Sequence, residues 1–150
     1  MTQISALGEF GLIKRLTQDI ELKNPETKKG VGDDCAVLEY DGEKEVLVTT
    51  DLLMEGVHFD LTYMPMKHLG YKSAIVNFSD VYAMGGTPKQ ITVSLALGKR
   101  FSVEDMDDFY ARPIWATRQM LSSTSFDATS IKSASSSITI TTCGSVFSPL

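Results

Sequence analysis

Cysteine, positive charge and long apolar runs are all scarce in this 150-residue sequence, and each scarcity excludes a class of protein. The two cysteines, Cys35 and Cys143, are too few for a disulfide framework or a cysteine-rich metal site. The formal net charge of -5 argues against a general nucleic-acid binder, because affinity for the phosphate backbone comes largely from clustered lysine and arginine. No apolar run approaches the roughly 20 residues of a membrane-spanning helix.

The N-terminal stretch MTQISALGEF also lacks the basic segment and apolar core of a secretory signal, so we expect a cytoplasmic protein. A hydrophobic content of 43% with 22% charged residues is ordinary for a soluble domain with one core. Because the chain is acidic, a polyanionic ligand would need metal ions or local dipoles to be held.

Hydrophobic spacing predicts an α+β fold. Residues 8–19 have the spacing of an amphipathic helix, and residues 65–86 have a broad apolar face that ends at paired glycines. Residues 35–40 and 45–50 read as an antiparallel pair joined by the turn sequence DGEK, and a further short strand is expected after residue 55. Residues 89–98 alternate as a strand, and Ser102 is a good N-cap for a final helix.

The composition changes at Ala111. Sixteen of residues 111–150 are serine or threonine, and Asp127 is the single acidic residue among them. Within this tail, only SITITTCG has the pattern of a strand. Segments with so little apolar surface cannot offset their ordering entropy, so we expect much of the tail to be loosely packed.

Three groups of acidic residues are candidate ligand sites. Asp33 and Asp34 follow the glycine-rich GVG, Asp51 ends the run TTD, and Asp80 lies in the apolar helical segment. Each has a structural alternative: Asp33 and Asp34 as turn residues, Asp51 as an N-cap, and Asp80 on a solvated helix side.

Taken together, the three groups favour a magnesium site. Mg²⁺ prefers oxygen ligands and binds through one or two carboxylates together with substrate phosphates and water. Neighbouring carboxylates repel each other unless a cation lies between them. The sequence has neither the phosphate-binding P-loop nor the glycine-rich loop of protein kinases, so a different kind of polyphosphate site is implied.

The remaining candidates have simple structural interpretations. His58 in EGVHF is either a hydrogen-bonded structural residue or a ligand, whereas His68 reads as an exposed helix residue. Lys14 and Arg15 fit a solvated helix face or a phosphate contact. Cys35 reads as a small core residue, and no Ser-His-Asp or Cys-His arrangement follows from the spacing.

Five motifs in order, GEFGLI, GVGDDCAVL, VTTDLLMEGVHF, HLGYKSAIVNFSDVYAMGGTP and ITVSLAL, carry a family resemblance. They make residues 3–110 similar to the N-terminal half of the thiamine-monophosphate kinases. That family lies in the ATP-binding superfamily of aminoimidazole ribonucleotide synthetase and selenophosphate synthetase. The resemblance implies a mixed or antiparallel sheet with helices packed on one face, and pairing of two copies through the sheet as a homodimer.

The resemblance also implies phosphoryl transfer from ATP to thiamine monophosphate, giving thiamine diphosphate, with several Mg²⁺ ions. His58 then matches a substrate contact and Tyr110 an ATP contact. The matching metal positions are Asp33, Asp34, Thr49, Thr50, Asp51 and Asp80, with the threonines acting through hydroxyl or backbone oxygen.

Residues 111–150 depart from the family pattern. They lack the GGDT motif that supplies ATP and metal contacts in the family, and we expect the C-terminal domain to be absent. We interpret residues 1–110 as the ATP- and Mg²⁺-binding domain and the tail as a frameshifted or unrelated end. Little or no kinase activity is therefore expected. The alternatives are a ligase or synthetase of the same superfamily, or a non-catalytic module that dimerises or binds Mg²⁺ weakly.

Overall fold

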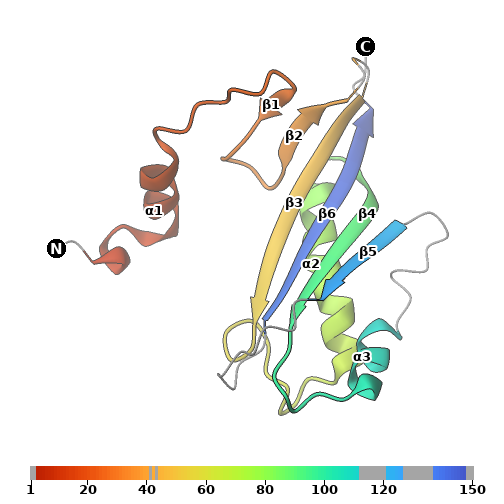
Figure 1. Cartoon of the computed structure of the whole chain (residues 1–150). Coiled ribbons are helices and arrows are strands. Elements are labelled where there is room, and N and C mark those ends of the chain that lie inside the picture. The colour runs from red at the N-terminus through yellow and green to blue at the C-terminus, as the bar shows by residue number, and fades with distance from the viewer. Residues whose placement is uncertain (1–2, 41, 43, 112–120, 127–136, 148–150) are drawn as a thin grey trace.

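The computed structural model describes residues 3–40, 42, 44–111, 121–126 and 137–147. Its centre is a six-stranded sheet, which α2 (Met66–Ala83) and α3 (Val103–Tyr110) cover on one face (Figure 1). The strand order is β1 (Thr27–Lys29), β2 (Ala36–Glu39), β3 (Lys44–Met54), β6 (Ser137–Phe147), β4 (Thr87–Ala96) and β5 (Leu121–Phe126). Neighbouring strands are antiparallel except for the parallel pair β4 and β5, so the expected mixed sheet with helices on one face is confirmed.

The predicted hairpin is confirmed as β2 and β3, with Ala36 opposite Val48. Strand β3 continues past the predicted residue 50 to Met54. Its burial alternates: Leu47, Thr49 and Leu53 are buried, whereas the residues between them are half-buried or exposed. Because side chains alternate between the two faces of a strand, Thr49 and Asp51 both lie on the face that α2 covers.

Helix α2 confirms the predicted helix and its glycine stop. Its buried residues recur every three to four positions, which gives it one packed face: Leu69, Gly70, Ser73, Ala74, Asn77, Phe78 and Val81. At its end, Gly85 has a φ of 72°, in the left-handed region, and the Gly86 N–H donates to the Val81 carbonyl. This geometry ends the helix directly before β4.

Two groups of buried side chains form the core. The larger lies between α2, α3 and the sheet and includes Leu69, Phe78, Val93 and Phe109. The smaller contains Cys35, Val37, Leu47 and Val81. The interpretation of Cys35 as a core residue is thus confirmed.

Helix α3 begins with the predicted Ser102 cap. The Asp105 N–H donates to the Ser102 hydroxyl at 3.2 Å, and the Ser102 N–H donates to the Asp105 carboxylate at 2.8 Å. This reciprocal capping box satisfies backbone donors that a helix start otherwise leaves unpaired.

The tail contributes more to the sheet than its composition suggests. The SITITTCG segment is part of β6, which pairs with β3 from Lys44 to Met54 and with β4 on its other side. β6 is therefore an interior strand, which confirms the strand pattern of SITITTCG. The rest of the tail contains β5, which the sequence pattern did not predict, and three stretches outside the described residues: 112–120, 127–136 and 148–150. The strand expected after residue 55 is reduced to one bridge between Glu55 and Phe59.

The N-terminal segment extends away from the sheet (Figure 1). It contains a short 3₁₀ turn, η1 (Ile4–Ala6), and the predicted first helix, α1 (Gly8–Thr17). None of the residues in either element is buried. Among the described helices, none is long and apolar enough to cross a membrane.

Candidate functional site

The candidate site lies between the middle of β3 and the last turn of α2. The Thr49 hydroxyl donates to Asp80 Oδ2 at 2.7 Å, although the two residues are 31 positions apart in the chain. Thr49 is 7% exposed and Asp80 is half-buried. This bond shows that the Asp80 carboxylate faces β3, so the alternative of a fully solvated helix side is wrong.

Asp51 lies two residues after Thr49, on the same face of β3. The pKa of Asp51 is raised, first by its burial and then by the negative charge of Asp80, whereas His58 acts to lower it. Asp51 therefore lies within the electrostatic range of both residues. The structure thus brings Asp51, Asp80 and Thr49 together from two elements.

Asp33 and Asp34 enter the same region from the loop before β2. They precede Ala36, which lies opposite Val48, so the loop meets β3 beside the Thr49 to Asp51 segment. Asp33 accepts the Asp34 N–H at 3.1 Å and pairs with Lys29, and the Lys29 hydrogen bond holds the pKa of Asp33 below its ordinary value. Asp33 thus has the turn role that the sequence left open, and Asp34 is the better ligand candidate of the two.

The pKa of the Cys35 thiol responds to carboxylates from both parts of the site. It is 2% exposed, and burial raises the pKa of its thiol to about 11, with further contributions from the charges of Asp80, Asp34 and Asp33. Three carboxylates from two parts of the chain therefore act on one sulfur. This convergence places Asp33, Asp34 and Asp80 around the start of β2.

We expect Cys35 to resist alkylation in the native chain. Burial blocks access, and a thiol with a pKa of about 11 is almost entirely protonated at neutral pH, whereas the thiolate is the reactive form. Peptide-resolved mass spectrometry after iodoacetamide treatment should show Cys35 labelled roughly 100-fold more slowly than in urea-unfolded chain. Labelling of the native chain at the unfolded rate would contradict the burial.

His58 has a structural role and lies near the site. Its Nδ1 accepts the Met54 N–H at 2.9 Å, which holds the loop after β3, and its carbonyl accepts from the Lys72 ammonium group. The interpretation of His58 as a structural residue is therefore supported. Because His58 also lowers the pKa of Asp51, its imidazole lies near that carboxylate.

Thr50 and Tyr110 are placed differently from the other candidates. Thr50 is exposed, and strand alternation directs it away from Thr49 and Asp51, so it could serve that site through its backbone oxygen alone. Tyr110 ends α3 and packs edge-on against Phe109, with ring centroids 5.2 Å apart. The structure therefore gives the Tyr110 ring a packing role.

Among the described residues, no three carboxylate, imidazole or thiol groups already stand close enough together to hold a metal ion. The donors that do converge are carboxylates and a hydroxyl, the oxygen ligands that Mg²⁺ prefers. The repulsion that Asp80 exerts on Asp51 would be relieved by a cation between them. The donor set therefore fits a hard divalent cation that arrives together with other ligands.

A buried amide near the site was not anticipated from the sequence. Asn77 is completely buried one turn before Asp80, its amide donates to the Ser73 carbonyl at 3.1 Å, and its Oδ1 has no hydrogen-bond partner. A polar residue within the apolar segment was the available signal, but helical spacing alone could not distinguish a buried position from an exposed one.

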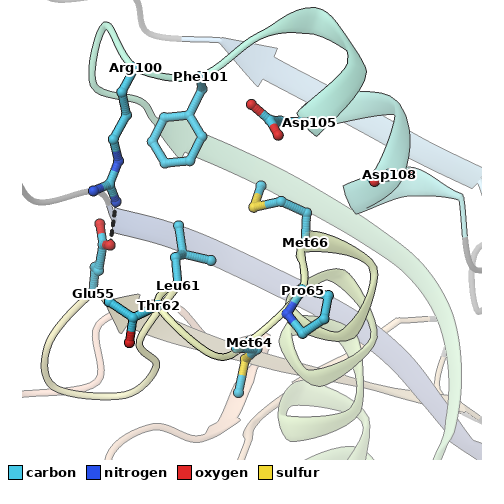
Figure 2. Close-up of a pocket in the computed structure, with 10 residues that line it drawn as sticks. All are labelled: Glu55, Leu61, Thr62, Met64, Pro65, Met66, Arg100, Phe101, Asp105 and Asp108. Carbon is cyan, nitrogen blue, oxygen red and sulfur yellow. Dashed lines mark hydrogen bonds and ion pairs between the residues drawn. The ribbon is translucent and has the colours of Figure 1, made fainter.

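A cavity of about 480 Å³ lies at the other end of the sheet, between the loop after β3 and α3 (Figure 2). None of the residues that were predicted to bind ligands lines it. Three of its charged groups already have structural partners: Glu55 pairs with Arg100, which also lies over the Phe101 ring, and Asp105 caps α3. We therefore assign the chemistry to the carboxylates of β3 and α2.

Comparison with known proteins places these observations in a family. The profile described as "AIR synthase related protein, N-terminal domain" matches residues 32–146. This match reaches residue 146, near the end of β6, and so extends beyond Ala111, where the composition changes. Curated relatives include thiamine-monophosphate kinases of Aquifex aeolicus, 43% identical over 108 residues, and of Bacillus subtilis, 35% identical over 104 residues. These alignments cover 72% and 69% of this chain but only 33% and 32% of the relatives, so the chain matches about one third of their length.

A solved structure described as "AaThiL complexed with AMPPCP and TMP" superimposes with a TM-score of 0.77 and 34% identity. It covers 98% of this chain, and the match spans 45% of that structure. The structure of tt0281 from Thermus thermophilus, with a TM-score of 0.73 and 21% identity, shares the fold.

Proposed function

The chain belongs to the family of N-terminal domains of AIR synthase related proteins, and from that premise we propose that it is the nucleotide- and Mg²⁺-binding part of a thiamine-monophosphate kinase. Its ligands would be ATP and thiamine monophosphate. The names of the relatives and the "AMPPCP and TMP" of the similar structure support this assignment.

The observation that carries the proposal is the hydrogen bond from Thr49 to Asp80 beside Asp51. Asp51 and Asp80 come from separate elements, and the negative charge of Asp80 raises the pKa of Asp51, so the two carboxylates repel each other. A magnesium-polyphosphate complex supplies the positive charge that they lack.

Each residue then has a definite role. Asp80 and Asp51 would hold metal ions, with Asp34 as a third carboxylate from the β2 side. The Thr49 hydroxyl fixes the orientation of the Asp80 carboxylate through their hydrogen bond. Bound Mg²⁺ would neutralise charge on the phosphate oxygens during transfer. We further propose that Asp33 and Thr50 complete the metal site, and that His58 and Tyr110 contact the substrate and ATP.

We propose that residues 1–110 form the binding domain and that the divergent tail still supplies β6 to its sheet. Because residues 111–150 lack the GGDT motif, the 150-residue polypeptide should bind nucleotide but turn over little. We also propose that it acts in the cytoplasm as a homodimer through the sheet, whose edge strands are β1 and β5.

The test is calorimetric titration with the ATP analogue AMPPCP, with and without Mg²⁺, alongside a steady-state assay with ATP and thiamine monophosphate. We expect saturable binding that requires Mg²⁺, and turnover below about one hundredth of the 1–100 per second typical of kinases. AMPPCP binding that does not depend on Mg²⁺ would overturn the proposed metal site. Turnover in the normal kinase range would overturn the expectation of low activity.

A further inference from the structure

The cavity between the loop after β3 and α3 has an apolar middle with charged groups at both ends. Leu61, Met66 and Phe101 reach into it from three different segments, and each is half-buried (Figure 2). The pair of Glu55 and Arg100 lies at one end, and two aspartates of α3 lie at the other. The volume of about 480 Å³ falls within the roughly 300–1,000 Å³ of small-molecule sites. The cavity is therefore large enough for a small organic ligand.

The wall of this cavity is negatively charged. Three carboxylates line it, those of Glu55, Asp105 and Asp108. The guanidinium of Arg100 is the one cationic group among the lining residues, so three negative charges and one positive charge leave a formal net charge of -2. Asp105 already accepts the Ser102 N–H, whereas the Asp108 side chain has no partner among the described residues. Because low-dielectric walls focus the field of like charges in a cleft, the cavity attracts a cation.

The Glu55 carboxylate is incompletely paired. Its side chain is 15% exposed, and Arg100 contacts one of its oxygens, Oε1. The other oxygen, Oε2, is shielded from solvent and has no hydrogen-bond partner among the described residues. A buried carboxylate oxygen without a donor is costly, and a positive charge nearby offsets part of that cost. A cation in the cavity would act on this oxygen through space, without displacing Arg100.

The lining favours an organic cation over a metal ion. Among the described residues, no three carboxylate, imidazole or thiol groups are close enough together to hold a metal, and here the carboxylates stand at opposite ends of the cavity (Figure 2). Between them lie apolar side chains, which offer no ligand to a hydrated metal ion: Leu61, Met64, Met66 and Phe101. An ammonium group attached to an apolar body matches both parts of the lining. The two methionines can adapt to bodies of different shape, because their side chains are flexible and polarisable.

We propose that this cavity binds a small amphipathic ammonium compound, a primary amine attached to an aromatic or alkyl body. The ammonium group lies at the α3 end, beside Asp105 and Asp108, and the body packs on Met66 and Phe101. Met66 begins α2, whereas Asp80 lies 14 residues later, about 21 Å along the helix at roughly 1.5 Å per residue. The amine site is therefore separate from the proposed magnesium site and does not depend on it.

Nuclear magnetic resonance of methionine methyl groups tests the location and the chemistry. The full chain, labelled with carbon-13 at these methyls, is titrated with 2-phenylethylammonium chloride and, separately, with 2-phenylethanol, which has the same body without the charge. We expect saturable shifts of the Met64 and Met66 signals, with a dissociation constant of about 1 mM or tighter and at least about tenfold weaker binding of the alcohol. The Met84 signal, at the far end of α2, should not move.

Three results would contradict the proposal. The first is Met64 and Met66 signals that stay unmoved or shift no more than Met84. The second is equal affinity for the amine and the alcohol, which would remove the role of charge. The third is displacement of the amine by an equal concentration of Mg²⁺, which would identify the cavity as a metal site.

Two neighbouring aspartates of α3 provide matched variants. Both are exposed, but Asp108 lines the cavity and Asp107 does not. We expect Asp108→Asn to weaken binding of 2-phenylethylammonium about fivefold, and Asp107→Asn, with the same change in net charge, to weaken it by less than about 1.5-fold. Both variants should bind AMPPCP with Mg²⁺ as the wild type does, so failure of the amine site can be distinguished from failure of the magnesium site. Equal effects of the two variants would show general attraction to an acidic chain and overturn the proposal.

Discussion

Asp80→Asn is expected to weaken Mg²⁺-dependent binding of AMPPCP at least about 100-fold, a loss of roughly 3 kcal/mol. The change keeps the size of the side chain and an oxygen that can accept from Thr49, but it removes the negative charge that faces Asp51. A divalent cation gains most from that charge, because the site is partly shielded from water. Titration calorimetry of the variant, compared with wild type, measures the effect.

The free energy of unfolding of the ligand-free Asp80→Asn variant should not fall, although its affinity for Mg²⁺ and AMPPCP does. Removing Asp80 removes one of the causes that raise the pKa of Asp51, so the ligand-free domain should be at least as stable as wild type. The control is Asp107→Asn, which deletes an exposed carboxylate of α3 and should change neither binding nor stability. Undiminished binding by a folded Asp80→Asn chain would remove Asp80 from the metal site.

Gly70→Ala is expected to destabilise the domain by about 3 kcal/mol or more, which corresponds to a fall of about 6–12 °C in the melting temperature. A Cβ at Gly70 would lie 1.9 Å from the Phe109 carbonyl oxygen and 2.9 Å from its carbon. These are backbone atoms, so no rotamer change relieves the overlap, and α2 and α3 must separate. Thermal and urea unfolding followed by circular dichroism provide the measurement.

The sign of this effect is informative. Within a helix, glycine to alanine normally stabilises by about 1 kcal/mol, so a large loss requires a specific steric cause. Gly11→Ala in α1 is the matched control, because Gly11 is also helical and its Cβ would meet only the Leu7 Cβ, at an ordinary contact distance of 3.5 Å. If Gly70→Ala proved neutral or stabilising, α3 could not pack as closely against α2 as the structure shows.

Several parts of the site were predictable from the sequence because they depend on neighbours along the chain. The DGEK turn between apolar segments predicted the β2 and β3 hairpin, and Ser102 predicted the cap of α3. The carboxylates Asp34, Asp51 and Asp80 were recognisable as oxygen donors. Their proximity was not, because hydrophobic spacing says nothing about which strand a helix packs against.

The face of β3 on which each threonine lies is a feature that sequence reasoning could not predict. Thr49 and Thr50 are adjacent and chemically identical, and sequence reasoning treated them alike. The structure places the Thr49 hydroxyl on Asp80 and directs Thr50 to the other side of β3. Burial against α2 sets the register of the alternation, and a shift of one residue would have exchanged the two roles.

By itself, the sequence determined most of the local elements, though not β5, together with the acidic oxygen donors and the family resemblance. Only the tertiary structure decided that a serine- and threonine-rich tail inserts β6 between β3 and β4, and that no residue of α1 is buried in the described domain. The physical reason is the same in both cases. Helix periodicity and turn chemistry act over a few residues, whereas strand pairing and burial join segments that are distant in the chain, and local composition does not specify those partners.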